Sequence, residues 1–471
     1  MNIKINNFGP IKKADLDIAP LTIFIGQNNS GKSYSSRLIH SLINPFDQSA
    51  GKPNKYANSI PLSYLIRNNK MLYNEFSEKL IKYIDSNPDF SQEPFEFPKD
   101  KFDLLLSEGI GRFYTQSIEY ILRFHFHNIN NLNNLMSNDS FNIEFNGIHL
   151  TNNDGSLSLK NFTFDSINSF NEIGYVKRII EKISRTDDKV LLYLNIDSSL
   201  LTHVETELIP TIVHATLTEV IIENLTDCSY YLPELTDMYL FDEDYVLSNK
   251  NTKFRPLKMN DELMTLILDK SEEDYLTFGY FKDLGMELSE ELFGCDIKPK
   301  PHSSHIEFID SENNILLSYD SLSASMREQL ALIIYLVKES QVNDTIIIEE
   351  PESHLHPKNQ RILVKYLVKL VNNGLNIILN TQSDYIIEQF NNFIRLGEVD
   401  SETLEELNYT PEHVLNPSDI RIYNFKKDSD YQYIAEPVDI NETGFDEESF
   451  SEISDALYDE SADIIDAMRS D

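Results

Sequence analysis

Apolar and polar residues at the beginning of the chain follow patterns that predict three strands and a helix. Residues 3–11 and 14–18 alternate with a period of two, which is typical of half-buried strands. Residues 21–25 form a continuous apolar run, which predicts a fully buried strand. Residues 34–43 carry apolar side chains at helical spacing. We therefore expect two strands that lead into a buried strand and then a helix.

The pattern changes between residues 46 and 229, where helical spacing is interrupted by Asn-rich turns. A β-like patch with an Asn-Asn-Asp-Gly turn lies among these helices. The segment contains no internal repeat and no sustained heptad register, so we expect a compact lid rather than a coiled-coil arm. The helical stretches are 62–86, 101–126 and 172–185, and the β patch is 141–164.

Strand character returns at residues 230–233, and strands and helices then alternate from 304 to 395, which predicts the parallel-sheet part of an α/β domain. The last segment ends in a predicted amphipathic helix. Its apolar stripe consists of Phe450, Ile453, Leu457, Ile464 and Met468.

The length of 471 residues allows roughly three domains of ~150 residues, or one large core with an insertion. We predict the second arrangement, an α/β core in two parts separated by a mainly helical insertion. The predicted divisions are 1–45 (N-terminal core), 46–229 (insertion), 230–395 (C-terminal core) and 396–471 (acidic C-terminal segment).

Between the buried strand and the helix lies a phosphate-binding loop. Residues 26–33 read Gly-Gln-Asn-Asn-Ser-Gly-Lys-Ser and match G-x-x-x-x-G-K-[ST] without exception. The glycines let backbone N–H groups point inward, the lysine reaches the β- and γ-phosphates, and the last serine ligates Mg²⁺. The sequence therefore predicts ATP and Mg²⁺ as cofactors. The predicted contacts are Gly26, Asn28, Asn29, Ser30, Gly31, Lys32 and Ser33.

A second buried run, at 345–348, ends in two carboxylates that supply what a phosphate loop lacks. Hydrolysis needs a group that holds Mg²⁺ and a group that orients the attacking water. We predict that Glu349 holds Mg²⁺ through a water molecule and that Glu350 is the general base. Pro351 ends the strand at this point.

These segments together resemble an ABC-type ATPase. Residues 320–329, Asp-Ser-Leu-Ser-Ala-Ser-Met-Arg-Glu-Gln, are similar to a degenerate Leu-Ser-Gly-Gly-Gln signature, and 377–383 resemble the last core strand with its switch loop. Glu-Glu-Pro-Glu-Ser-His-Leu-His-Pro at 349–357 resembles the SMC/RecF-like and OLD-like (overcoming-lysogenisation-defect) branch, which occurs in DNA repair and antiphage defence. The resemblance covers about residues 1–45 and 315–395.

The resemblance implies a P-loop NTPase fold with an ABC-ATPase head, a mixed sheet with flanking helices, and a head-to-head homodimer with ATP between the subunits. Ser323 and Ser325 would contact the ATP of the other subunit, and Gln382 would act at the switch position. The chain departs from the family at Glu349 (usually Asp), at Gln382 (usually His), and at Ala324 and Ser325, which replace the signature glycines. We therefore predict slow turnover.

Composition and charge narrow the choice of partners. The formal net charge is −37, and residues 398–471 hold 22 acidic and four basic side chains, a net charge of −18. This balance disfavours broad binding to DNA and suits either a solvated surface or a docking face for a basic partner. Two cysteines form no disulfide framework, and the chain contains no apolar run of about 18 residues. We expect a cytoplasmic protein without a membrane partner.

Three other functions compete with an ATPase sensor that controls a separate effector. A transporter subunit is disfavoured because 291 residues separate Lys32 from Ser323. A self-contained OLD-like nuclease is disfavoured because only 76 residues follow Arg395, and we interpret the Asp-x-Asp at 428–430 as a surface loop. A DNA-loading repair ATPase of RecF type would need a basic track, which the sparse lysines and arginines do not form.

We therefore expect a slow ATPase that serves as sensor or scaffold in a prokaryotic antiphage complex and controls a nuclease or toxin. His354 and His356 lie in the loop after the acidic pair, and we interpret them as packing and hydrogen-bonding residues rather than metal ligands.

Overall fold

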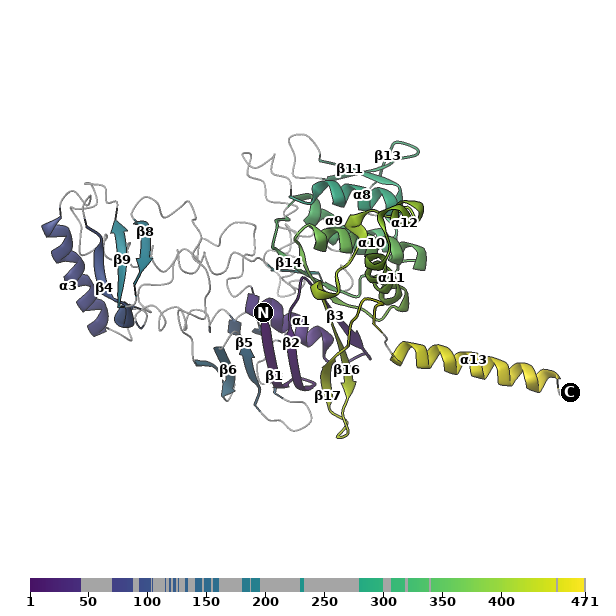
Figure 1. Cartoon of the computed structure of the whole chain (residues 1–471), viewed down its shortest axis with the longest axis horizontal. Coiled ribbons are helices and arrows are strands. Elements are labelled where there is room, and N and C mark those ends of the chain that lie inside the picture. The colour runs from purple at the N-terminus through teal and green to yellow at the C-terminus, as the bar shows by residue number, and fades with distance from the viewer. Residues whose placement is uncertain are drawn as a thin grey trace. The chain divides into compact units, whose positions relative to one another are not determined.

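The computed structural model divides into two compact units, which are described separately (Figure 1). Unit 1 comprises Met1–His40, Asn134–Ser137 and Ser229–Asp471, and unit 2 comprises Ser41–Asn133 and Asn138–Cys228. The structure describes residues 1–43, 70–87, 93–102, 140–145, 148–153, 156–160, 180–186, 188–194, 229–232, 279–299, 306–317, 321–338, 340–445 and 448–469, with isolated residues between 104 and 133.

A mixed sheet forms the centre of unit 1. Strands β10, β14, β15, β3 and β16 run parallel to one another, β17 is antiparallel to β16 and parallel to β2, and β1 is antiparallel to β2. The predicted α/β fold class is thus confirmed. In spatial order the strands are β10 (Ser229–Leu232), β14 (Thr345–Glu349), β15 (Asn376–Asn380), β3 (Leu21–Gly26), β16 (Ile420–Lys427), β17 (Tyr433–Pro437), β2 (Ile11–Asp17) and β1 (Asn2–Phe8).

The central strands are buried along their length, which explains their continuous apolar sequences. Glu349 at the end of β14 lies opposite Asn380 of β15, which in turn lies opposite Phe24 of β3. The carboxyl ends of three parallel strands therefore share one edge of the sheet, the edge at which open α/β sheets bind ligands.

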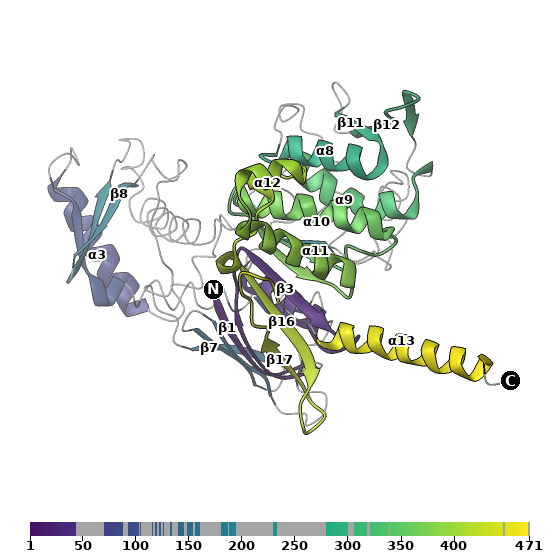
Figure 2. The same cartoon turned by 45° about the vertical axis from the view of Figure 1, so that its right-hand side comes forward.

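Helices pack beside this sheet and supply most of the apolar core. Helix α8 packs against α9 and α10, and α10 packs against α11 (Figure 2). A small antiparallel sheet precedes α9. The helices are α1 (Lys32–Ile43), α8 (Lys282–Phe293), α9 (Ala324–Lys338), α10 (Pro357–Asn372), α11 (Asp384–Arg395) and α12 (Ser401–Glu406), and the small sheet contains β11 (Cys295–Pro299), β12 (Ile306–Asp310) and β13 (Ile315–Leu317).

The end of the chain contains the hairpin β16–β17 and the long helix α13 (Glu448–Arg469), the yellow helix of Figure 2. Asp428 and Asp430 lie in the hairpin turn and both accept hydrogen bonds from Lys12. The turn confirms the interpretation of this Asp-x-Asp as a loop. Within the described residues, no helix is both long enough and apolar enough to cross a membrane.

Unit 2 combines helix α3 with short antiparallel sheets. Phe76 of α3 packs with its ring against Phe95 and Phe97 of β4. The described elements are α3 (Lys70–Ser86), β4 (Phe95–Pro98), β5 (Asn142–Phe145), β6 (Ile148–Asn153), β7 (Ser156–Lys160), β8 (Ile180–Arg185) and β9 (Lys189–Leu194).

The prediction of a helix over 172–185 is wrong for its last part, because Ile180–Arg185 forms strand β8. This strand pairs with β9, whose buried residues alternate with a period of two, and the pairing overrides the local helical spacing. The β patch is confirmed by β5, β6 and β7. Parts of the predicted helices, namely 62–69, most of 103–126 and 172–179, lie outside the described residues. The predicted domain boundaries stay a prediction.

Candidate active site

The phosphate-binding loop connects the end of β3 to the beginning of α1, as the sequence predicts. Gly26 and Gly31 have φ angles of 125° and 111°, which side-chain-bearing residues rarely adopt. A Cβ atom at Gly26 would collide with the backbone carbonyl of Phe425, and one at Gly31 would collide with Ile11. Both glycines are therefore required by the fold, and the loop lies between two other segments of the core.

Lys32 is buried at the first position of α1. Its ammonium group donates hydrogen bonds of 2.7 Å to the carbonyl of Gly26 and 3.0 Å to that of Gln27, so it bends back over its own loop. Burial lowers the pKa of Lys32, and the nearby carboxylates of Glu350, Glu352 and Glu349 oppose this shift. A lysine beside three carboxylates lies where a nucleotide's phosphates would meet the acidic strand end.

Glu349 is 6% exposed and both of its carboxylate oxygens have partners. Oε1 accepts a hydrogen bond of 3.3 Å from the Asn380 side chain, and Oε2 lies 3.7 Å from the Arg37 guanidinium. Asn380 in turn accepts a 2.9 Å hydrogen bond from Ser36 of α1. The predicted Mg²⁺-side acid is therefore held from two directions, by β15 and by the helix after the phosphate loop.

Arg37 also connects this acid to strand β10. Its Nε donates a 2.9 Å hydrogen bond to the Tyr231 hydroxyl. Burial raises the pKa of Tyr231 well above its ordinary value, and the charge of Glu349 raises it further, so the phenol stays protonated. The side chains of Arg37, Tyr231 and Glu349 thus form a cluster of a cation, a phenol and a carboxylate.

Glu350, the predicted base, follows the strand in an unusual backbone conformation. Its φ angle is 45°, in the left-handed region that non-glycine residues rarely adopt and that is concentrated at functional sites. Its backbone N–H donates to the carbonyl of Asn380 at 2.9 Å. The side-chain amide of Gln382 donates a short hydrogen bond to the Glu350 carboxylate. The predicted switch residue is thus in direct contact with the predicted base.

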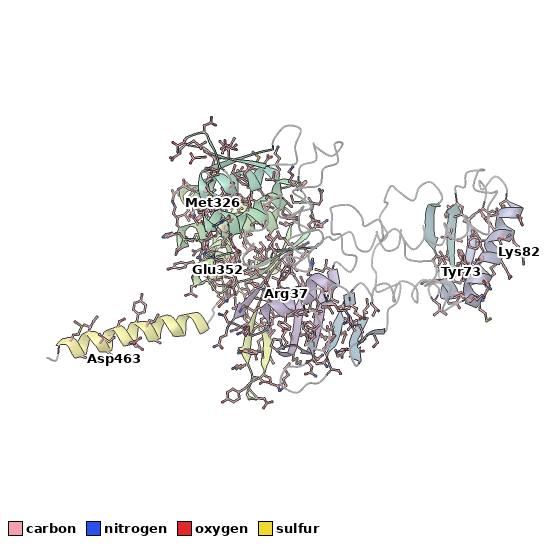
Figure 3. All side chains as sticks on the ribbon, turned by 180° about the vertical axis from the view of Figure 1, so that it is seen from behind. Arg37, Tyr73, Lys82, Met326, Glu352 and Asp463 are labelled. Atoms are coloured by element: carbon pink, nitrogen blue, oxygen red, sulfur yellow. The ribbon has the colours of Figure 1, made fainter. Side chains whose placement is uncertain are left out.

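Glu352, which is labelled in Figure 3, contacts Gln382 and is a third carboxylate of the site. Its Oε1 accepts hydrogen bonds from the Gln382 backbone N–H at 2.7 Å and from the Thr381 hydroxyl at 2.9 Å. Burial raises the pKa of the Glu352 carboxyl, although these hydrogen bonds act in the opposite direction. Its Oε2 is buried and has no hydrogen-bond partner in the part of the chain that the structure describes.

The predicted signature lies at the beginning of α9. The Ser323 and Ser325 hydroxyls are 3.0 Å apart, and Ser323 accepts a 3.2 Å hydrogen bond from the Met326 backbone N–H. Ser323 is exposed and Ser325 is half-buried. Within the described residues, no hydrogen bond joins either serine to the phosphate loop of the same chain. Gln329 is buried further along α9 and donates to the carbonyl of Pro351 at 2.8 Å.

The donor set fits Mg²⁺ better than a metal with a complete protein cage. Among the described residues, no three His, Cys, Asp or Glu side chains are grouped as metal ligands. Nucleotide-bound Mg²⁺ needs only one or two protein oxygens besides phosphate and water, and the Ser33 hydroxyl and the Glu349 carboxylate are of this kind. His356 instead caps α10 through a hydrogen bond from the Lys358 backbone N–H.

The structure brings Lys32, Glu349, Glu350 and Gln382 together. Ser323 lies just before α9 and Ser325 lies in its first turn, and within the described residues no hydrogen bond joins either serine to that group. Sequence reasoning missed Arg37, Asn380 and Glu352. Glu352 carried a usable signal as a further acid directly after the acidic pair, whereas Arg37 had no signal beyond its place on the helix that follows the loop.

Comparisons with known proteins agree with the phosphate loop. A family model described as an AAA ATPase domain matches residues 1–387. No curated protein matches the chain. Two solved structures are weakly similar, each at 10% identity. One is an SMC head bound to the C-winged helix domain of ScpA (TM-score 0.39, covering 93% of this chain and 97% of that chain). The other is the SMC head domain from Thermotoga maritima (TM-score 0.33, covering 93% of this chain and 98% of that chain). Structural likenesses as weak as these carry no argument about function.

Proposed function

The chain belongs to the AAA ATPase domain family, and from this premise we propose that it is a slow, Mg²⁺-dependent ATPase of the ABC type. In cells it would act as the sensor or scaffold subunit of an antiphage complex that controls a separate effector. The observation that supports the ATPase activity is the convergence of Lys32, Glu349, Glu350 and Gln382 at one edge of the sheet.

Each of these residues has a role that follows from its position. Bound Mg²⁺ would neutralise charge on the phosphates, and the Ser33 hydroxyl and the Glu349 carboxylate would hold it. Lys32 would exchange its loop carbonyls for phosphate oxygens. Glu350 would accept the proton of the attacking water, and Gln382 would orient the Glu350 carboxylate.

The homodimer is supported by the location of the signature serines. Ser323 and Ser325 lie at the N-terminus of a long helix, where hydroxyls and backbone N–H groups favour an anion. Ser323 is exposed, and among the described residues neither serine is bonded to the phosphate loop of its own chain, so the γ-phosphate of a second copy is the partner that suits them. Each active site would then contain residues from both subunits.

The proposed effector contact is supported by helix α13. Its described apolar side chains are exposed, and its sequence is rich in Asp and Glu. An exposed helix face that is both acidic and apolar suits a basic partner with an apolar groove. The exposed members of the stripe are Leu457 (59% exposed), Ile464 (54%) and Met468 (75%); the side chains of Phe450 and Ile453 lie outside the described part.

The proposed activity is tested by two acid variants. Glu350→Gln keeps the shape but removes the base, so ATP should bind, persist and hold the dimer, which sedimentation with ATP and Mg²⁺ measures. Glu349→Gln should instead raise the Mg²⁺ concentration that binding requires. Glu436→Gln, in a surface ion pair with Lys426, is the matched control. A Glu350→Gln protein that hydrolyses ATP at the parental rate would place the base elsewhere.

Family membership is equally compatible with a RecF- or SMC-like ATPase that loads onto DNA. A gel shift with duplex DNA, with and without ATP, separates the two functions. The effector-controlling function predicts no shift, in keeping with the net charge of −37. A tight shift that requires ATP would favour the DNA-loading function.

A further inference from the structure

Two loops meet at the edge of the sheet where Lys32, Glu349 and Glu350 converge, the proposed catalytic edge. One follows β14 and contains Glu350 and Glu352, and the other follows β15 and contains Thr381 and Gln382. The Glu350 backbone N–H is bonded to the Asn380 carbonyl, so the loops begin in contact. Further contacts between the two loops determine where Gln382 lies relative to Glu350.

Glu352 supplies that connection through a single oxygen. Its Oε1 accepts from both the Gln382 backbone N–H (2.7 Å) and the Thr381 hydroxyl (2.9 Å). Thr381 is fixed in turn, because its backbone N–H donates to the Phe24 carbonyl of β3 at 3.1 Å. The Glu352 carboxylate therefore ties the beginning of the switch loop to the acidic loop.

The consequence reaches the predicted base through Gln382. The backbone of Gln382 is bonded to Glu352, and its side-chain amide is bonded to Glu350. A chain of contacts thus runs from Glu352 through one residue to the carboxylate of Glu350. Loss of the first contact would free the backbone that aims the amide, and a displacement of about 1 Å at such a group lowers the rate strongly.

The cost of this arrangement suggests that it serves more than folding. Oε2 of Glu352 is buried and lacks a hydrogen-bond partner among the described residues. A buried carboxylate with one unsatisfied oxygen destabilises a fold relative to an apolar side chain of similar size. Residues that break a general rule of folding, such as the pairing of buried polar atoms, without stabilising the fold are commonly functional residues.

We propose that Glu352 is a positioning residue, which holds Thr381 and Gln382 so that the Gln382 amide stays on the Glu350 carboxylate. This inference rests on the proposed ATPase function. Glu352 does not take up the proton of the attacking water; it acts through Gln382. An acceptor at its Oε1 position is what the role needs, and a negative charge is not.

Three variants test this role, with Glu291→Ala as a matched control. Glu352→Ala removes the acceptor, Glu352→Gln retains an acceptor oxygen, and Thr381→Val removes one of the two hydrogen bonds with little change of shape. Glu291 also accepts hydrogen bonds, from Lys365 and Tyr366, but in the contact between α8 and α10. Steady-state kinetics gives kcat and KM, and hydrogen exchange of the peptide around Gln382 reports the tie without any catalysis.

We expect Glu352→Ala to lower kcat by about 10- to 100-fold with little change in KM, and Thr381→Val to lower it by about threefold. Glu352→Gln should remain within about threefold of the parent, and so should Glu291→Ala. The Gln382 amide should exchange about tenfold faster or more in Glu352→Ala, with protection retained in Glu352→Gln.

Parental kcat and parental exchange in Glu352→Ala would overturn the proposal. Equal losses in Glu352→Gln and Glu352→Ala would overturn it as well, because the charge would then matter instead of the acceptor. If Glu352→Ala does not fold, an unchanged kcat and exchange rate in Thr381→Val would count against it. A parent protein without ATPase activity would defeat the proposed function, while the exchange measurement would still decide the role of Glu352.

Discussion

The proposed catalytic edge of unit 1 and helix α13 carry charge in opposite ways. At the catalytic edge, Lys32 and Glu349 are buried, and each is fixed by hydrogen bonds or an ion pair. On α13, the described acids and apolar side chains are exposed to solvent. Buried, fixed charges act on a bound ligand without reorganisation, whereas an exposed mixed face is free to bind another surface.

The two regions should also differ in how they respond to substitution. Removing one partner of a buried charged pair leaves the other charge unpaired in the protein interior. This lowers the free energy of unfolding much more than changing an exposed charge does. We therefore expect large, mutually dependent effects at the catalytic edge and small effects on stability along α13.

The largest effect is expected for Lys32→Ala. The variant loses the cation that meets the β- and γ-phosphates, so the affinity for ATP should fall by about 100-fold. Titration with a fluorescent ATP analogue measures this, and Lys358→Ala, an exposed lysine of α10, is the control. Unchanged affinity in Lys32→Ala would mean that the loop does not bind phosphate.

A smaller effect is expected for Arg37→Ala. The variant leaves the buried Glu349 without its cation 3.7 Å away, so the free energy of unfolding should fall by about 2 kcal/mol. The same loss makes the site more negative, so half-saturation with Mg²⁺ should need less metal. Chemical denaturation and Mg²⁺ titration measure the two effects. An Mg²⁺ requirement that rises instead would show that Arg37 mainly aims the carboxylate.

The pH dependence of stability tests the Glu352 carboxyl, whose Oε2 atom is buried. Its pKa is raised above the ordinary value of 4.5 by burial, so its contribution to stability is present below that value and is lost as pH rises through the folded-state pKa. Glu352→Gln cannot ionise and avoids this loss, worth about 1.4 kcal/mol per unit of pKa difference. Thermal unfolding from pH 4.5 upward should favour the variant increasingly. A constant difference across this range would contradict the raised pKa.

The smallest effect on the core is expected from deleting α13. Phe445 is buried and exchanges two hydrogen bonds with Asn391, so a truncation should begin after it, at residue 448. Deletion of 448–471 should change core stability by no more than about 0.5 kcal/mol and leave ATP binding intact. Proteins that co-purify with the full chain should be lost, and moderate salt should weaken the full-length complex.

Leu457→Ser with Ile464→Ser is the matched variant, because it retains the acids and removes two exposed apolar side chains. Partner retention by the truncated chain at every salt concentration would exclude α13 as the docking face. Unfolding of the truncated chain would show instead that α13 packs on its own core.

Local patterns predicted the parts of the molecule that depend on neighbours in the chain. The phosphate loop, the buried strand before it and the helix after it follow from residues 21–43, because turn, strand and helix signals lie side by side. Strand β14, which ends at Glu349, and the acid that follows it, Glu350, were predictable for the same reason.

The rest depends on segments that only the fold brings together. Arg37, Tyr231 and Glu349 meet because α1, β10 and β14 are neighbours in space, and none of them carries a local signal for the others. Strand β8 shows the same limit, because pairing with β9 decided its structure against a helical spacing. Glu352 joins a loop to a switch segment about thirty residues away, which periodicity cannot reveal.

Single-turnover hydrolysis tests most directly whether the catalytic edge is an ATPase centre with Glu350 as its base. The parent protein and Glu350→Gln are each saturated with radiolabelled ATP and Mg²⁺, and the bound ATP converted to ADP is followed in time. We expect the parent to hydrolyse ATP more slowly than the ~1–100 s⁻¹ of phosphoryl-transfer kinases. We expect Glu350→Gln to bind ATP equally well and to hydrolyse it about 100-fold more slowly than the parent. Equal rates in the two proteins, at equal ATP occupancy, would contradict the assignment.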